Sequence, residues 1–179
     1  MILPDEAVKW IKLHRTHLSG DLKREYEKDV QNDFDLILPH LPTRLNSIVD
    51  IGCGMAGIDV LLAKQYPQAT ITLLDGDGPE SNFRGGYGSV MEPFNSRDVV
   101  NEIFSLNDLP PPRWLKVWTK EAIEADLVLS LLSWGYHYPL STYKAIGLCI
   151  ADLRKKFPVL GTLIVSTNKY NRCIWTSSA

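Results

Sequence analysis

The chain has 179 residues, 45% hydrophobic and 22% charged, which is typical of one globular domain with a substantial core. Its net charge is -2 and it has no run of Lys or Arg, so nucleic acid and anionic membranes are not supported as its main partner. Its three scattered cysteines argue against disulfides and a zinc site, and no apolar run reaches the about 18 residues of a membrane span, so we expect a cytoplasmic protein.

The first 44 residues are expected to form a helical extension. Apolar residues at steps of three and four predict a short helix over 5–18 and a longer one over 21–38, with Asp21 as the N-cap of the second. His14 and His17 have a spacing that could hold a metal ion. Because no third ligand lies nearby in the sequence, we expect no metal site.

A short strand followed by a glycine turn organises the rest of the chain. Residues 47–51 are apolar enough for a buried strand, and Gly52, Gly54 and Gly57 then lead into an amphipathic helix that Pro67 closes. Glycines let the backbone approach a ligand, and the first amides of the helix would face it. The spacing matches Gly-x-Gly-x-x-Gly, so a nicotinamide or flavin dinucleotide is one interpretation.

Two acidic residues favour a different ligand. Asp50 lies two residues before the first glycine, where its carboxylate would repel a pyrophosphate in a partly dry site. It suits a ligand with an ammonium or a sulfonium group, and S-adenosylmethionine carries both. The second predicted strand, over 70–75, ends in Asp75, about 20 residues past the turn, as expected for a carboxylate that holds ribose hydroxyls.

The remaining sequence alternates between helices and strands. Residues 76–95 lack a clear period and are expected to form either a surface insertion or a lid beside the ligand. The pattern then predicts, in order, a helix over 96–109 with Ser96 as its N-cap, strands over 114–118 and 126–132, a helix over 141–157 and a strand over 161–167. This alternation predicts a parallel, doubly wound α/β sheet with ligands at the carboxyl ends of its strands.

The strings Val-Asp-Ile-Gly-Cys-Gly and Leu-Leu-Asp together resemble the class I S-adenosylmethionine-dependent methyltransferases, over about residues 45–167. The resemblance implies a Rossmann-like, mostly parallel sheet within a single domain over 1–179. It also implies that the cofactor contacts Asp50, Gly52, Cys53, Gly54, Asp75 and Gly76. No partner histidine can be assigned to Cys53, so we do not expect it to be a nucleophile.

The C-terminal end departs from the family pattern. The family usually finishes with two further strands, the last of them antiparallel, whereas residues 168–179 are long enough for one at most. We therefore expect that the sheet is shortened, that the chain is a fragment, or that a second subunit covers the exposed edge. The last of these would make the protein a homodimer.

In this family the loop after the fourth strand lies next to the transferred methyl group, and here it reads Ser-Trp-Gly-Tyr-His-Tyr-Pro. His137 can be neutral at cellular pH and is the candidate general base, although a histidine in a tight turn can also serve only the backbone. Trp134, Tyr136 and Tyr138 either belong to the core or form a pocket for a small-molecule acceptor. The loop lacks the Asn/Asp-Pro-Pro-aromatic motif of enzymes that N-methylate nucleic-acid bases, which disfavours that activity.

The function that these features favour is an S-adenosylmethionine-dependent methyltransferase acting on oxygen in a small hydroxylated or sugar-like acceptor. Leu-Leu-Asp-Gly-Asp-Gly and the aromatic loop are similar to the corresponding strings of proteins assigned as sugar O-methyltransferases. The alternative is a non-catalytic S-adenosylmethionine-binding module or partner subunit, for which the short C-terminal end is the reason. A dinucleotide-dependent oxidoreductase is a third interpretation.

Overall fold

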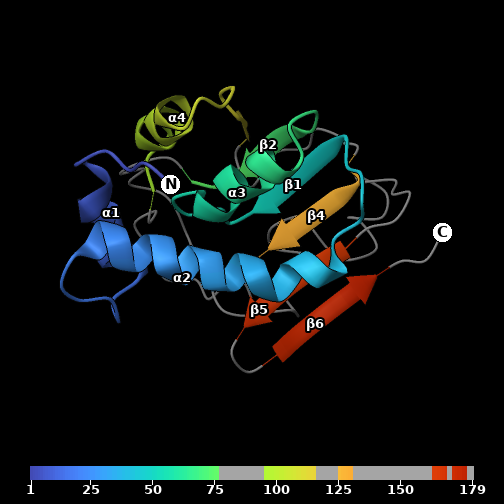
Figure 1. Ribbon diagram of the computed structural model, residues 1–179, viewed down its shortest axis with the longest axis horizontal. Helices are drawn as coiled ribbons and strands as arrows, with labels where there is room; N and C mark the ends of the chain where they lie inside the picture. Colours follow the sequence, from blue (N-terminus) through green and yellow to red (C-terminus); the bar gives the residue numbers. More distant parts are fainter. Residues whose placement is uncertain (77–94, 116–124, 131–162, 169–170, 177–179) are drawn as a thin grey trace.

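The computed structural model describes residues 1–76, 95–115, 125–130, 163–168 and 171–176, which form an α/β fold around one six-stranded sheet (Figure 1). The strands are β1 (Ser47–Ile51), β2 (Thr70–Leu74), β3 (Arg113–Leu115), β4 (Leu127–Ser130), β5 (Leu163–Asn168) and β6 (Asn171–Thr176). The helices are α1 (Ala7–His14), α2 (Leu22–Ile37), the short 3-10 helix η1 (Leu38–His40), α3 (Gly57–Gln65) and α4 (Arg97–Leu106).

The strand order is β3-β2-β1-β4-β5-β6, so β1 lies near the middle of the sheet. The first five strands are parallel to one another. The chain moves outward from β1 through β2 to β3 and then returns to the other side of β1 as β4, which confirms the predicted doubly wound sheet. In such sheets ligands usually bind at the carboxyl ends of the strands where the order reverses, which are β1 and β4 here.

The segment after β5 contributes one strand to the described sheet, as the sequence predicts. This strand, β6, runs antiparallel to β5 and pairs along its whole length, from Leu163 opposite Thr176 to Asn168 opposite Asn171. The last strand is therefore the antiparallel one, as in the resembled family. Whether its edge meets a second subunit stays a prediction.

Helix α2 is the best-predicted helix. Its apolar stripe is buried, comprising Tyr26, Val30, Phe34 and Ile37. The Asp21 carboxylate caps it as expected and accepts a hydrogen bond from the amide of Arg24 at 3.3 Å. Fully burying a large apolar side chain stabilises a fold by about 1.5–3 kcal/mol, so this stripe holds α2 on the rest of the protein.

Helix α1 is shorter than the predicted 5–18: it begins at Ala7 and ends at His14. Arg15 leaves the helical conformation, with φ of -122° and ψ of 65°, and its guanidinium pairs with Asp29 and Asp33 of α2. The spacing of apolar residues would allow the helix to continue to Leu18. The ion pairs of Arg15 with α2 instead favour the observed end at His14.

Helix α4 begins after Ser96, the predicted N-cap, but it ends before the predicted residue 109. Ser96 stands at the N-cap in an extended conformation, but its side chain makes no capping hydrogen bond. The helix stops at Leu106, and Asp108 then adopts a left-handed conformation with φ of 57°. β3 begins at Arg113, one residue before the prediction.

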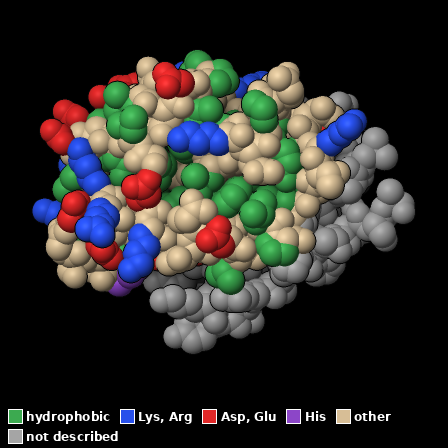
Figure 2. Space-filling view, viewed as in Figure 1, with side chains coloured by type: hydrophobic (Ala, Val, Ile, Leu, Met, Phe, Trp, Pro, Cys, Tyr) green, Lys and Arg blue, Asp and Glu red, His purple; other side chains and the backbone are tan. Residues whose placement is uncertain are grey.

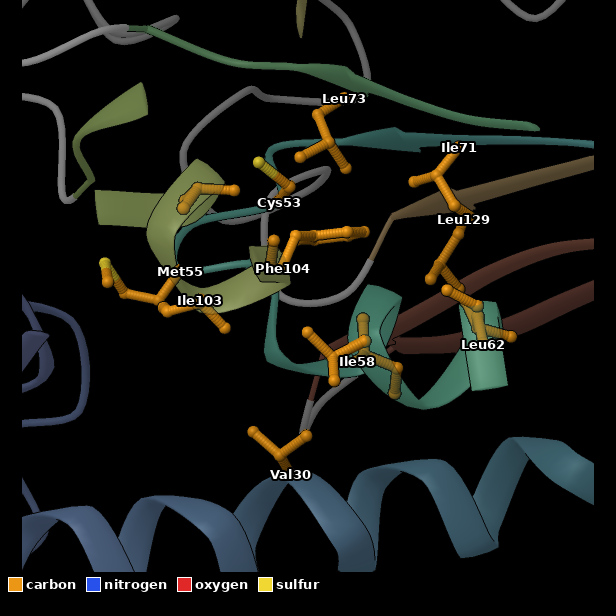
Figure 3. Packing of buried hydrophobic residues seen from close by; sticks show 14 of the residues in the cluster. Val30, Cys53, Met55, Ile58, Leu62, Ile71, Leu73, Ile103, Phe104 and Leu129 are labelled. Atoms are coloured by element: carbon orange, nitrogen blue, oxygen red, sulfur yellow. The ribbon is translucent and has the colours of Figure 1, made fainter. Parts of the chain in front are cut away.

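The core lies between the sheet and helices α2, α3 and α4 (Figure 3). Val30 of α2 points towards Ile58 of α3, while Ile103 and Phe104 of α4 reach the same cluster. The sequence predicts one apolar face for α3, but most of its side chains are buried. The reason is that α2 packs against α3, so neighbours cover more of this helix than the sheet alone would.

Charges of both signs are interspersed among the described side chains on the face shown in Figure 2. They gather over the end of the molecule that α1 and the start of α2 form (Figures 1 and 2). Within the described part of the chain, none of the helices combines the length and the apolar character needed to cross a bilayer.

Candidate functional site

The turn after β1 is built from left-handed backbone conformations. Gly52 has a φ of 77° and Gly54 a φ of 54°, values that glycine adopts without steric cost. Ala56 also lies in this region, with φ of 52°, and is the N-cap of α3. The amide of Gly52 donates to the carbonyl of Leu74 at 2.8 Å, which joins the start of the turn to the end of β2.

The third glycine of the motif serves packing. A Cβ at Gly57 would lie 2.7 Å from the Tyr26 hydroxyl and 2.8 Å from Cγ2 of Val30, both on α2. Only a residue without a side chain lets α2 approach the first turn of α3 this closely. The helical extension and the glycine turn are thus in direct contact.

Asp75 follows β2 and faces the same turn. One of its oxygens accepts a hydrogen bond from the amide of Gly54 at 2.9 Å, and the other accepts one from the amide of Gly76 at 2.7 Å. Burial raises the pKa of Asp75 to about 6, against the lowering effect of these amides. A carboxylate oxygen has two lone pairs, so each oxygen can accept a further hydrogen bond besides the one from its amide.

Asn95, which sequence reasoning missed, is buried close to Asp75, and its amide lowers the pKa of that carboxyl. Neither polar atom of its side chain makes a hydrogen bond of normal geometry within the described part of the chain. An asparagine just before a helix suggests a cap, so its sequence context gives no sign of this position.

Asp50 lies near the end of β1 and is only 1% exposed. Its side chain does not point into solvent, and Oδ1 has no hydrogen-bond partner among the described residues. Asp50 lines a cavity of about 20 Å³ between the glycine turn and α2. Burial and the neighbouring Asp59 raise the pKa of Asp50 well above its usual value.

Asp59 is the second functional candidate that sequence reasoning missed. It lies in the first turn of α3 and is completely buried, and neither carboxyl oxygen has a partner of normal geometry in the described structure. It is close enough to Asp50 to share a hydrogen bond once one of the two is protonated. Acids in a first turn are usually solvated helix-dipole partners, so only the apolar residues on both sides of Asp59 hint at burial.

Arg15 closes the helical side of the cavity. Its two Nη atoms lie 3.0 Å from carboxylate oxygens of Asp29 and Asp33. The Nε atom is buried without a partner among the described residues. The guanidinium charge is therefore balanced by acids of α2, and Asp50 has no such counter-ion among the residues that the structure describes.

Cys53 is a buried thiol inside the turn. Its Sγ donates to the carbonyl of Gly54 at 3.6 Å, and burial raises its pKa well above the usual value. A protonated thiol is a poor nucleophile, which agrees with the expectation that it is not one.

The structure brings together six predicted cofactor residues around the turn: Asp50, Gly52, Cys53, Gly54, Asp75 and Gly76. The predicted acceptor-side residues Trp134, Tyr136, His137 and Tyr138, and positions 77–94 of the predicted lid, lie outside the described residues. His17 approaches Asp29 at 3.4 Å, and the described residues contain no group of three or more side chains arranged to hold a metal ion.

No family model matches the sequence, and no curated protein matches it either. Among solved structures, the fold is similar to an assigned O-methyltransferase from Nostoc punctiforme PCC 73102, with TM-score 0.56 and 13% identity over 88% of this chain and 40% of that chain. It is also similar to magnesium protoporphyrin IX methyltransferase from Synechocystis PCC 6803 with bound S-adenosylmethionine, with TM-score 0.53 and 13% identity over 93% of this chain and 73% of that one.

A third similar structure is the StiE O-methyltransferase region 961–1257, with TM-score 0.52 and 13% identity over 92% of this chain and 52% of that chain. The chain thus spans 40% of the Nostoc protein and about half of the StiE region. The strand order of this chain and the similarity of its fold to these three structures lead to one conclusion: this chain has the fold of the class I S-adenosylmethionine-dependent methyltransferases.

Proposed function

We propose that the protein is an S-adenosylmethionine-dependent methyltransferase that acts on an oxygen of a small hydroxylated or sugar-like acceptor. The observation that carries the proposal is the buried carboxyl group of Asp50 beside the glycine turn. In a dry site this group favours a positively charged ligand and opposes a diphosphate. The sheet reversal puts the turn where ligands of this fold bind.

Each cofactor contact follows from the chemistry of the turn. Asp75 would accept hydrogen bonds from the ribose hydroxyls through the lone pairs that Gly54 and Gly76 leave free. The bare backbone at Gly52 would let the amino-acid end approach. Asp50 would attract the positive charge of that end. Together these contacts fix both the sugar and the charged tail, which is what orients a methyl group for transfer.

The bound cofactor supplies an electrophilic methyl group for an in-line displacement. The protein then chiefly positions two reactants, which is a large part of catalysis for such a reaction. A hydroxyl acceptor must lose its proton, and we assign that role to His137, which is basic enough when neutral. Trp134, Tyr136 and Tyr138 would hold the acceptor by their ring faces and hydroxyl groups.

Calorimetry of the purified chain with S-adenosylmethionine, S-adenosylhomocysteine and NAD tests the cofactor assignment. We expect the first two to bind and NAD to bind much more weakly. Asp75→Asn should weaken the binding of S-adenosylmethionine by at least about tenfold, because a lost charged hydrogen bond is worth about 1.5–3 kcal/mol. Asp35→Asn on the exposed face of α2 is the matched control and should bind as the unmodified chain does. Tighter binding of NAD would refute the proposal.

Turnover tests the reaction itself. Formation of S-adenosylhomocysteine is measured over a panel of hydroxylated acceptors, with amine and thiol analogues alongside. We expect oxygen acceptors to be methylated and His137→Ala to abolish this while cofactor affinity is retained. Unchanged turnover in His137→Ala would remove the proposed base.

A further inference from the structure

Asp50 and Asp59 form a buried carboxyl pair between β1 and the first turn of α3. Asp50 is 1% exposed and Asp59 is 0% exposed. Oδ1 of Asp50 and both oxygens of Asp59 have no donor of normal geometry in the described part of the structure. Two ionised carboxylates this close in a dry site repel each other strongly, so the empty pair retains a proton between them.

The cavity on which Asp50 opens has the size of one small polar group. Its volume of about 20 Å³ exceeds the roughly 10–15 Å³ that one water needs. An ammonium group is about as large as water, whereas a sulfonium with three carbon substituents is too large to enter. The unpartnered, buried oxygen of Asp50 lines this space together with Gly52 and Cys53.

Among the described groups that line the cavity, Asp50 is the acid without a positively charged partner. Arg15 and Asp33 line the opposite wall and are paired with each other. Among the described residues, the further titratable groups near the pair are Tyr26, Asp29, Cys53 and Asp75. Burial raises the pKa of both the Tyr26 hydroxyl and the Cys53 thiol, so neither contributes a negative charge near neutral pH.

We propose that Asp59 is a further positioning residue, which shares a proton with Asp50 in the empty protein, and that the ammonium group of the cofactor's amino-acid end enters the cavity and displaces this proton. The O–H bond of one carboxyl group breaks, the proton leaves to solvent, and the ammonium pairs with the ionised Asp50. Asp59 acts through Asp50 and does not itself line the cavity. The inference rests on the proposed function, since the ligand is the cofactor named there.

The consequence is that cofactor affinity depends on pH. Burial raises the pKa of Asp50 well above its usual value and that of Asp59 to about 7, so below neutrality the pair holds a proton that binding must expel. If binding releases one proton, the affinity for the cofactor falls by up to about tenfold for each unit by which the pH is lowered. Asp75, with a pKa of about 6, titrates in an overlapping range, so its contribution must be separated.

Methylthioadenosine provides that separation, because it keeps the adenine and ribose but has neither the amino-acid end nor the positive charge. Dissociation constants of S-adenosylmethionine and methylthioadenosine are measured by calorimetry at pH 5.5, 6.5 and 7.5. We expect the preference for S-adenosylmethionine to fall by about tenfold or more between pH 7.5 and 5.5. Equal pH dependence of the two ligands would overturn the inference.

Asp59→Asn removes the shared proton and keeps the shape of the side chain. In this variant burial still raises the pKa of Asp50 but the neighbouring acid no longer does, so the preference should change less over the same range than in the unmodified chain. Asp98→Asn is the matched control, because Asp98 is also an acid in the first turn of a helix but is exposed. It should behave as the unmodified chain does. A preference whose pH dependence is as large in Asp59→Asn as in the unmodified chain would overturn the role of Asp59.

Proton release can also be measured on the unmodified protein, which keeps the inference testable if Asp59→Asn does not fold. Calorimetry at pH 6.5 in buffers of different ionisation enthalpy counts the protons. We expect nearly one more proton to be released with S-adenosylmethionine than with methylthioadenosine. Binding without this difference would overturn the inference and leave the proposed function standing. If S-adenosylmethionine binds at no pH, both are overturned.

Discussion

Substituting Gly57 by alanine tests how tightly α2 is fitted to the glycine turn. The new Cβ would lie 2.7 Å from the Tyr26 hydroxyl, 2.8 Å from Cγ2 of Val30 and 3.0 Å from Cε1 of Tyr26. Separations below 3.0 Å force either α2 or α3 to move. Overpacking of this kind costs about 1–3 kcal/mol, and the better helix propensity of alanine offsets at most about 1 kcal/mol of that. We therefore expect Gly57→Ala to lower the free energy of unfolding by about 1–2 kcal/mol.

Urea unfolding followed by tryptophan fluorescence measures the loss, and a double-mutant cycle identifies its source. Val30→Ala removes one of the two closest atoms, so the cost of Gly57→Ala should shrink by at least about 0.5 kcal/mol in the Val30→Ala background. Gly20→Ala is the contrasting control. Gly20 has a φ of 78° and open space around its Cβ position, so it should destabilise through backbone strain, with no coupling to Val30. Strictly additive effects of Gly57→Ala and Val30→Ala would refute the steric argument.

Three further predictions concern buried polar groups. Burial raises the folded-state pKa of Asp59 to about 7, above its unfolded value, so its stabilising contribution is complete below about pH 4 and is lost as pH rises towards 7. Asp59→Asn should therefore make the unfolding free energy less dependent on pH between 4 and 7, and urea melts across that range that match the unmodified chain would contradict this. Ser130→Ala removes the 2.8 Å hydrogen bond from the Ser130 hydroxyl to the carbonyl of Ile51 and should cost about 1–3 kcal/mol in thermal or urea unfolding, whereas an unchanged midpoint would argue against it. Asn107→Ala removes amide hydrogen bonds to both backbone groups of Ile2, at 3.0 and 2.8 Å, and should speed hydrogen exchange at the N-terminal segment; unaltered exchange there would show that other contacts hold it.

The elements with a strong local signal could be predicted from the sequence. The apolar stripe of α2, the Asp21 cap and the strands on either side of the glycine turn all depend on residues close together in the chain. Their order then gives the doubly wound sheet, because parallel strands joined by helices have few allowed topologies. The position of Asp75 at the end of β2 could also be predicted, because Asp75 directly follows that strand in the sequence.

What the sequence could not supply depends on contacts between distant segments. Arg15 ends α1 because its ion-pair partners lie on α2, and no residue near Arg15 in the sequence indicates these partners. Asp59 is buried because α2 packs against α3 and covers what would otherwise be a solvated turn. The role of Gly57 was hidden in the same way, since the neighbours that exclude a side chain there are Tyr26 and Val30.

The close fit of α2 to the start of α3 has a consequence for protein engineering. A minimal domain that began at β1 would lose the wall that Tyr26 and Val30 form, and Gly57 would then border an open groove. Water would reach Asp59, whose carboxyl would ionise as freely as any surface acid. Transplanting the glycine loop into another scaffold would therefore require the preceding sixteen-residue helix to travel with it.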